Sequence, residues 1–503
     1  MLFRRALVFG AALAATAALA LPATPGEARR VASGPGAPGI GDEYFPGYGN
    51  GGYDVSHYDL RLKYTPATDQ LQGTATLNVR ATQDLTRFSL DFLLAVSSIR
   101  VNGAPATFTR SGSELTVTPA RALNYGQPAT IVVQYAGIPS QAVVNGYTAW
   151  SRTPDGALAV GEPEIAAWWF PSNDHPLDKA TFDISVAVPD GTEVLSNGTL
   201  AGRSSERGWT RWSWRSTKPM ATYLALLAVG QYDIITGTAP NGQPIVTAYA
   251  ENLGPSDGAA RASIERTGEI VDYLTSVFGA YPFEAQGGVV PSAGLGFALE
   301  NQTRPAYSPA FFRRGSNTYV VAHENAHQWF GDSISVAKWR NIWLNEGFAT
   351  YAEWLWSEHQ GEGTAQELFE WEFSTRPASD PFWQVLPGDP GAPALFNGAV
   401  YDRGAMTLHA LRETVGDSAF FRILRAWVDE QKYGNATIEQ FIAVSERISG
   451  QQLDSLFKTW LFTKGKPTEW ASAAGLQAKG ATPVRPKSIT KIKQAHEALH
   501  AAR

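Results

Sequence analysis

The stretch from Tyr319 to Trp356 constrains this chain more than any other part of its sequence. Within it, His323, Glu324 and His327 form the pattern H-E-x-x-H. Side chains four positions apart lie on one face of a helix, so both imidazoles can reach a single metal ion, and the glutamate beside them can take a proton from a water molecule. Catalytic zinc usually has three protein ligands, and Glu346, which follows His327 after 18 intervening residues, is the candidate for the third.

The flanking residues predict two helices that would bring these side chains together. Ser316 or Asn317 can cap a first helix, and Gly331 can end it. A second helix is predicted to begin near Trp343, with apolar residues at helical spacing after it and Glu346 in its first turn. The candidate ligands would then face one another. The alternative is that H-E-x-x-H is a chance string on an amphipathic helix.

Two longer motifs surround the candidate ligands. Residues 323–332 read H-E-N-A-H-Q-W-F-G-D, and residues 343–353 read W-L-N-E-G-F-A-T-Y-A-E. Together they resemble the M1 (gluzincin) family of zinc aminopeptidases. The resemblance implies one zinc ion on His323, His327 and Glu346, with Glu324 as general base. Asn325 departs from the family, which usually has an apolar residue there, and its side chain is expected to point away from the metal.

Two further glutamates match family motifs that bind the amino group of a substrate. Glu162 lies in G-E-P-E-I at residues 161–165, and the resemblance implies that it reaches from an N-terminal β domain into the catalytic cleft. Glu300 lies in F-A-L-E-N-Q at residues 297–302, where the family has G-x-M-E-N, and the resemblance implies that it binds the α-ammonium group. Phe297 replaces the first glycine of that motif, which is expected to reshape the first substrate pocket. The alternative for each glutamate is a solvated side chain without a binding role.

A tyrosine motif follows a segment, residues 374–399, that is rich in Pro, Gly, Asp and aromatic residues. Residues 400–406 read V-Y-D-R-G-A-M and open a predicted helix. The family has Y-x-K-G-A here. The resemblance implies that Tyr401 donates a hydrogen bond to the developing oxyanion, which a phenol does without ionising.

Composition and the N-terminus exclude several other classes of protein. A net charge of −6, with no basic stripe and no phosphate-binding loop, argues against nucleic-acid binding. The absence of cysteine excludes disulfides and a thiol nucleophile. Basic residues within Met1–Arg5 and the apolar run Ala6–Leu21 are typical of a secretory signal peptide, predicted over 1–28. A secreted protein without a stable membrane span after cleavage is therefore expected, and a retained N-terminal anchor is the alternative.

The remaining pattern predicts a multi-domain α+β chain, since 503 residues exceed one ordinary domain. A Gly- and Pro-rich flexible leader is expected over 29–41, and short alternating strands predict an antiparallel β domain over 42–236, which the resemblance implies is saddle-like. For 237–467, where a helix is predicted from Ala260 to Phe278, the resemblance implies a thermolysin-like, mainly helical catalytic domain. Residues 468–503 are Ala-rich and basic, and are expected to form a disordered tail with at most one short helix near 492–501, without a large C-terminal helical domain.

These features predict a zinc-dependent aminopeptidase that acts on peptides with a free N-terminus. If Glu162 and Glu300 both bind the ammonium group of a substrate, they would position the substrate by its N-terminal end, so that single residues are removed from that end. A secreted zinc endopeptidase with the same core is the alternative if the two carboxylates do not converge. A catalytically silent binding protein is a second alternative, which the complete set of ligands and base disfavours.

Overall fold

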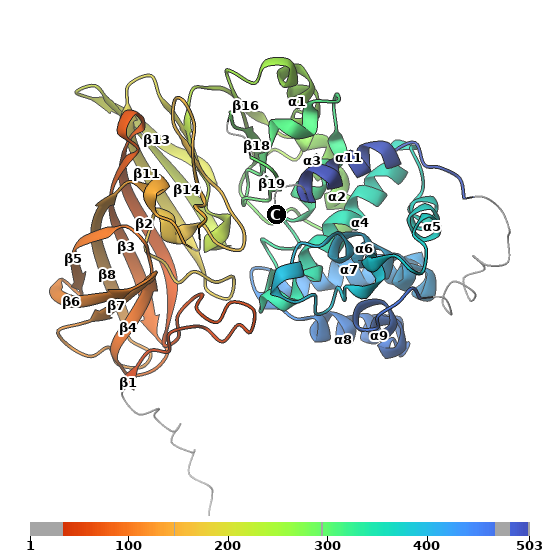
Figure 1. Ribbon diagram of the computed structural model, residues 1–503, viewed down its shortest axis with the longest axis horizontal. Coiled ribbons are helices and arrows are strands. Elements are labelled where there is room, and N and C mark those ends of the chain that lie inside the picture. The colour runs from red at the N-terminus through yellow and green to blue at the C-terminus, as the bar shows by residue number, and fades with distance from the viewer. Residues whose placement is uncertain (1–33, 145, 293–294, 468–482, 501–503) are drawn as a thin grey trace, which may run out of the picture.

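The computed structural model describes residues 34–144, 146–292, 295–467 and 483–500. Figure 1 shows two domains side by side: a β-rich domain from the first half of the chain, coloured red to yellow, and a mainly helical domain from the rest, coloured green to blue. This arrangement confirms the predicted α+β fold and its order. The predicted signal peptide, residues 1–28, lies outside the described residues. Within the described ranges, no helix is both long enough and apolar enough to cross a membrane.

The first domain is built on one large sheet, in which strands alternate buried and exposed side chains, as half-buried strands do. Neighbouring strands pair antiparallel, except that β1 pairs parallel with β4 and β2 with β11. In spatial order the strands are β1 (Gly34–Pro35), β4 (Leu85–Asp91), β7 (Glu114–Thr118), β6 (Ala104–Ser111), β5 (Ala95–Val101), β8 (Pro128–Gly137), β3 (Gln70–Ala81), β2 (Tyr53–Thr65), β11 (Lys179–Pro189), β14 (Trp209–Ala221) and β13 (Thr199–Glu206). The pairing of β1 shows that Gly34 and Pro35, expected in a flexible leader, belong to the sheet.

A second sheet packs beside the large one through aromatic side chains. Its order is β12 (Glu193–Leu195), β15 (Leu227–Gly230), β10 (Ala157–Ala159) and β9 (Trp150–Arg152). Trp212 and Trp214 of β14 donate their indole N–H groups to the carbonyls of Thr192 and Val194, at 3.1 and 2.9 Å. A buried indole N–H group usually finds such a partner. The tryptophans therefore join the two sheets.

The second domain begins with a sheet of its own. Its order is β16 (Tyr232–Thr238), β17 (Pro244–Ala250), β18 (Gln286–Val290), β20 (Ala306–Tyr307) and β19 (Ala298–Leu299). Strand β16 crosses the predicted domain boundary at 236/237 and pairs with β17. By hydrogen bonding, the second domain therefore begins at Tyr232.

Helices make up most of the second domain. In chain order they are α1 (Asp257–Ile264), α2 (Thr267–Phe278), α3 (Thr318–Ala326), α4 (Trp343–Gln360), α5 (Ala365–Thr375), α6 (Gly398–Val415), α7 (Asp417–Gln431), α8 (Ile438–Ser449), α9 (Asp454–Phe462) and α11 (Ile489–His500). The helix predicted from Ala260 to Phe278 is two helices, α1 and α2. A short parallel ladder joins β21 (Ser335–Val336) to β22 (Asn435–Ala436).

The short helix expected near 492–501 is present as α11, but the expectation of a disordered tail around it was wrong for residues 483–500. Helix α11 packs against α3, and Ile489, Ile492 and Leu499 on its apolar face are buried. The spacing of these residues was visible in the sequence, but the surface that buries them was not. Residues 468–482 lie outside the described ranges.

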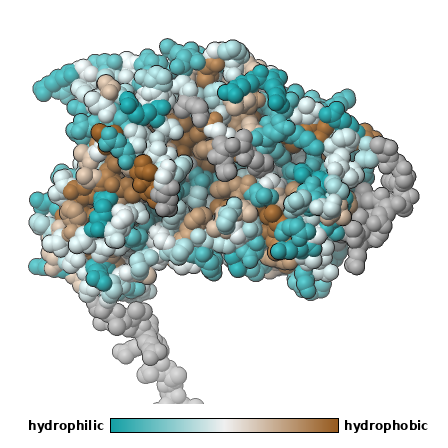
Figure 2. All heavy atoms as spheres, viewed as in Figure 1, coloured by the Kyte–Doolittle hydropathy of each residue, from teal (hydrophilic) through white to brown (hydrophobic). Residues whose placement is uncertain are grey.

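Polar contacts from the β domain hold the loop that follows α3. Lys179, at the start of β11, donates to the carbonyls of Asp332 and Ser333 at 2.7 and 2.9 Å. The carboxylate of Asp42 accepts from the backbone N–H of Trp339 at 2.7 Å. Figure 2 shows polar residues around most of the rim, with apolar residues gathered on the β domain and near its boundary with the helical domain.

Candidate active site

Helix α3 presents the H-E-x-x-H residues. Its N-cap is Asn317, whose side chain accepts from the N–H of Tyr319 at 3.0 Å, as predicted. The helix ends at Ala326 rather than at Gly331, and His327 is its C-cap. Because His327 retains helical dihedrals, φ −57° and ψ −24°, the two imidazoles keep their one-turn spacing.

The three predicted metal ligands meet in the protein interior. The Nε2 atoms of His323 and His327 lie 3.3 and 3.4 Å from Oε2 of Glu346, which α4 places in its first turn as predicted. One donor atom from each of the three residues lies within 4.8 Å of the other two. Two imidazoles and one carboxylate with this separation fit a catalytic zinc ion.

Each histidine is oriented through its other ring nitrogen. Nδ1 of His323 lies 2.6 Å from a carboxylate oxygen of Glu353, and Nδ1 of His327 lies 3.0 Å from the carbonyl oxygen of Phe330. Both acceptors favour the tautomer with a proton on Nδ1, which leaves the Nε2 lone pair directed at the ligand cluster. Both imidazoles therefore have an Nε2 lone pair that is available to a metal ion.

Glu324 lies beside the predicted ligands, in a second cluster with Glu300 and His327. Its Oε1 is buried without a hydrogen-bond partner among the described residues. Burial raises the pKa of this carboxyl to about 7, although the two neighbouring imidazoles lower it. A general base works best when its pKa is near the pH of the reaction, so Glu324 is suited to exchanging a proton with water.

Tyr401 approaches the ligands because α4 and α6 pack closely. A Cβ atom added to Gly404 of α6 would lie 2.9 Å from Cα of Gly347 in α4, so only glycine allows this crossing. Tyr401, three residues before Gly404, stacks its ring on that of His323 with centroids 5.9 Å apart and an interplanar angle of 16°. The predicted tyrosine therefore lies beside a predicted ligand.

Glu300 and Glu162 reach the same region from different domains. Glu300, which follows β19, accepts a hydrogen bond from the hydroxyl of Tyr223 at 2.9 Å, and its carboxylate lies within 4.8 Å of ligand atoms of Glu324 and His327. Glu162 lines a cleft of about 680 Å³ between the two domains, which Phe297 also lines. Burial raises the pKa of Tyr223, and the charges of Glu300 and Glu162 raise it further. The charges of both glutamates therefore act on one tyrosine, which Glu300 also contacts directly.

Two family models match this sequence. The Peptidase family M1 domain matches residues 304–460, and the Peptidase M1 N-terminal domain matches residues 55–224. The chain belongs to the M1 peptidase family. The first model covers the predicted ligands, Glu324 and Tyr401, and the second covers Glu162.

Named relatives of this M1 protein include aminopeptidases. It is 27% identical to glutamyl aminopeptidase of Rattus norvegicus over 455 residues, which cover 82% of this chain and 47% of that protein. It is 29% identical to aminopeptidase N of Streptomyces lividans over 324 residues, which cover 59% of this chain and 36% of that protein. The chain therefore spans about half the length, or less, of these relatives.

Solved structures of M1 zinc metallopeptidases share the fold over nearly their whole length. A mutant of the enzyme from Deinococcus radiodurans, bound to a Tyr-Ser-Ala substrate, is 29% identical with a TM-score of 0.75, and the match covers 84% of this chain and 97% of that one. A two-domain M1 zinc metallopeptidase bound to L-arginine is 29% identical with a TM-score of 0.77, covering 85% and 98%.

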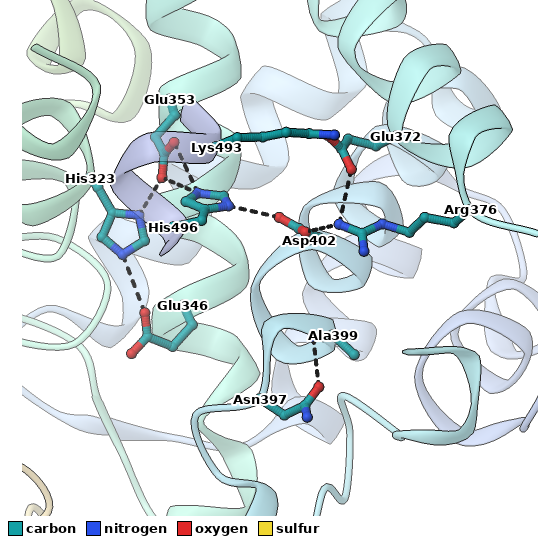
Figure 3. Close-up of polar contacts among 10 residues, drawn as sticks. All are labelled: His323, Glu346, Glu353, Glu372, Arg376, Asn397, Ala399, Asp402, Lys493 and His496. Atoms are coloured by element: carbon teal, nitrogen blue, oxygen red, sulfur yellow. Dashed lines mark hydrogen bonds and ion pairs between the residues drawn. The ribbon is translucent and has the colours of Figure 1, made fainter. Parts of the chain in front are cut away.

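Three residues of this M1 site were not predicted from the sequence. Glu353 supports a ligand, and its position seven residues after Glu346 on one helix, two turns away, was a usable signal. Tyr223, which binds Glu300, carries no local motif. His496 lies where only a short helix without a functional role was expected, and its ring nitrogens contact Glu353 and Asp402, as Figure 3 shows.

Proposed function

We propose that this M1 protein is a zinc-dependent aminopeptidase that hydrolyses the first peptide bond of peptides with a free N-terminus. One observation carries the proposal: His327 belongs both to the three-residue ligand cluster and to a second cluster with Glu324 and Glu300. A metal site, a base and an acceptor for an ammonium group are thereby close enough to act on one substrate.

The residues present fit one zinc ion, held by His323, His327 and Glu346. When bound, zinc acts as a Lewis acid that polarises the scissile carbonyl and lowers the pKa of a water molecule. Glu324 takes a proton from the attacking water and delivers it to the leaving nitrogen, which its pKa of about 7, raised by burial, suits. Tyr401 donates a hydrogen bond from its phenolic O–H to the oxygen on which negative charge develops.

Recognition of the substrate's N-terminus is assigned to Glu300 and Glu162. A carboxylate paired with an ammonium group forms charge-assisted hydrogen bonds, which are shorter and stronger than neutral ones. Two such partners, one from each domain, fix the amino group relative to the ligand cluster, so only the first peptide bond reaches it. The wall formed by Phe297 bounds the cleft beside Glu162.

The test compares one short peptide with its N-acetylated form, each with and without a metal chelator. The proposal predicts loss of a single N-terminal residue from the free peptide only, and no cleavage after chelation. Internal or equal cleavage of both peptides would favour a zinc endopeptidase. Absence of any cleavage by zinc-loaded protein would favour a binding role.

We also propose that the protein is exported, on the strength of the basic Met1–Arg5 and apolar Ala6–Leu21. Expression of the full-length sequence in a host with a secretion pathway tests this. Recovery of a processed chain outside the cytoplasm is the expected result, and an unprocessed cytoplasmic chain would contradict it.

A further inference from the structure

Helix α11 is anchored on the two helices that carry the predicted zinc ligands. The side chain of Asn317, the N-cap of α3, donates to the carbonyl of Lys491 at 2.9 Å. Just before α11, the hydroxyls of Ser488 and Ser357, the latter in α4, lie 2.8 Å apart. With the buried apolar residues of α11, these contacts fix the position of its remaining side chains.

His496 is the polar residue that α11 directs into the interior, where it is 8% exposed. Its Nε2 lies 3.0 and 3.1 Å from the two carboxylate oxygens of Glu353, and its Nδ1 lies 3.0 Å from an oxygen of Asp402. A carboxylate accepts hydrogen bonds, so the ring donates from both nitrogens. His496 therefore joins α4 to α6 through two charged groups.

Each of these carboxylates is next to a side chain of the proposed mechanism, one through a polar contact and the other in the chain. Glu353 contacts Nδ1 of His323 at 2.6 Å, and Asp402 directly follows Tyr401 in α6. Asp402 is held from its other side by Arg376, as Figure 3 shows. One imidazole thus contacts both Glu353, which bonds a predicted zinc ligand, and Asp402, which follows the predicted oxyanion donor in α6.

We propose that His496 is a positioning residue of the zinc site, and that α11 is a working part of that site. His496 fixes the Glu353 carboxylate, which in turn fixes the tautomer and direction of His323. It also fixes Asp402, and with it the helical turn that presents Tyr401. The inference rests on the proposed function, because it takes His323 as a zinc ligand.

A second metal ion does not explain the same residues. One donor atom each from His323, Glu353 and His496 lies within 4.8 Å of the other two. The nitrogen–oxygen distances of 2.6 to 3.1 Å among them are hydrogen-bond lengths. An ion would need about 2.0–2.2 Å to each donor atom and would have to separate pairs already in contact.

The experiment measures zinc affinity in full-length protein by equilibration with a competing chelator of known affinity, followed by metal analysis. The variants are His496→Ala and His496→Gln, which retains one amide donor for Glu353. Glu497→Gln, on the same helix as His496, is the matched control. It removes only an exposed ion pair with Arg314.

We expect His496→Ala to raise the zinc dissociation constant about 10- to 100-fold, the usual range for a lost outer-shell partner. We expect His496→Gln to fall between it and the wild type, and Glu497→Gln to match the wild type. In turnover of the free peptide, kcat should fall in His496→Ala while KM changes less. Wild-type affinity in His496→Ala, or an equal loss in Glu497→Gln, would overturn the inference. A wild-type protein that binds no zinc would overturn the proposed function as well, which separates the two failures.

Discussion

Glu324 is buried beside three potential ligands, yet one of its oxygens accepts no hydrogen bond among the described residues. A buried carboxylate oxygen without a hydrogen-bond partner is costly, so its presence needs a chemical reason. We predict that Glu324→Gln keeps the fold and the zinc content but lowers kcat by about 10²–10⁴, the contribution of a positioned general base. Metal analysis and peptide turnover on one sample measure both properties. Normal turnover in this variant would refute the assignment of the base.

Glu300 allows a separate test of end recognition. Glu300→Gln keeps an acceptor for the hydroxyl of Tyr223 but removes the negative charge. We predict that kcat/KM for a free peptide falls about 10- to 100-fold, as expected for a lost charge-assisted hydrogen bond. The zinc content of Glu300→Gln should stay unchanged. The control is Glu251→Gln, at an exposed position, which should match the wild type in both kcat/KM and zinc content. An unchanged preference for free over N-acetylated peptide would contradict the role.

Residues within the motifs could be placed from the sequence, because their spacing is local. His323, His327 and Glu346 lie on two consecutive helices, and short-range geometry brings them together. Tyr223 and His496 could not be placed, because their partners lie far away in the chain and neither has a characteristic sequence around it. His496 is 143 positions from Glu353.

At the scale of elements, the crossing of α4 and α6 determines the distance from Glu346 to Tyr401. A Cβ atom at Gly404 would lie 2.5 Å from Cδ1 of Trp343, and it would also crowd Gly347. We predict that Gly404→Ala destabilises the protein by about 1–3 kcal/mol, the usual cost of overpacking, and lowers kcat because Tyr401 moves. Thermal unfolding and turnover measure these effects.

The control for this substitution is Gly258→Ala in α1, where an added Cβ meets no atom within 4 Å. Alanine is the better helix former by about 1 kcal/mol, so this variant should be as stable as the wild type or more stable. Equal destabilisation by both substitutions would show that the α4–α6 crossing is not the cause.

Helices and strands were predictable where an apolar repeat or a capping residue marked them. They were not predictable where tertiary contacts determine whether a segment is ordered. The predicted cap Asn317 marked the start of α3 in advance. A short helix was expected near 492–501, but the Ala-rich, basic sequence around it favoured a tail without packed structure. Its order comes from the surface of α3, which no sequence window contains.

At the scale of the whole molecule, Asp42 joins the two domains. It accepts from the N–H of Trp339 in the helical domain and from His175 in the β domain, at 2.7 and 3.2 Å. Burial opposes ionisation, but these hydrogen bonds and those from Tyr44 and Phe45 prevail and lower the pKa of Asp42 from 3.8 to about 2. The contact between domains therefore depends on a charged carboxylate.

A lowered pKa in the folded state stabilises the protein above the pKa of the unfolded chain, and that stability is lost as pH falls through the folded value. We predict that Asp42→Asn is about 1–2 kcal/mol less stable than the wild type at pH 6. The difference should shrink between about pH 4 and pH 2, the window between the two pKa values. Metal-free protein is used so that zinc release does not contribute. The exposed Asp59→Asn is the control, and a difference independent of pH would contradict the argument.

The separation of Glu353 and His496 in the chain has a consequence for biosynthesis. A ribosome adds about 5–20 residues per second, so about 7–30 s pass between the synthesis of these two residues. During that interval the nascent chain already carries all three zinc ligands and the general base, but His323 lacks its completed support. On the proposed function, the support of His323 is therefore completed only after His496 has been added, and we expect a chain interrupted between Glu353 and His496 to carry every predicted ligand but to bind zinc more weakly than the longer chain.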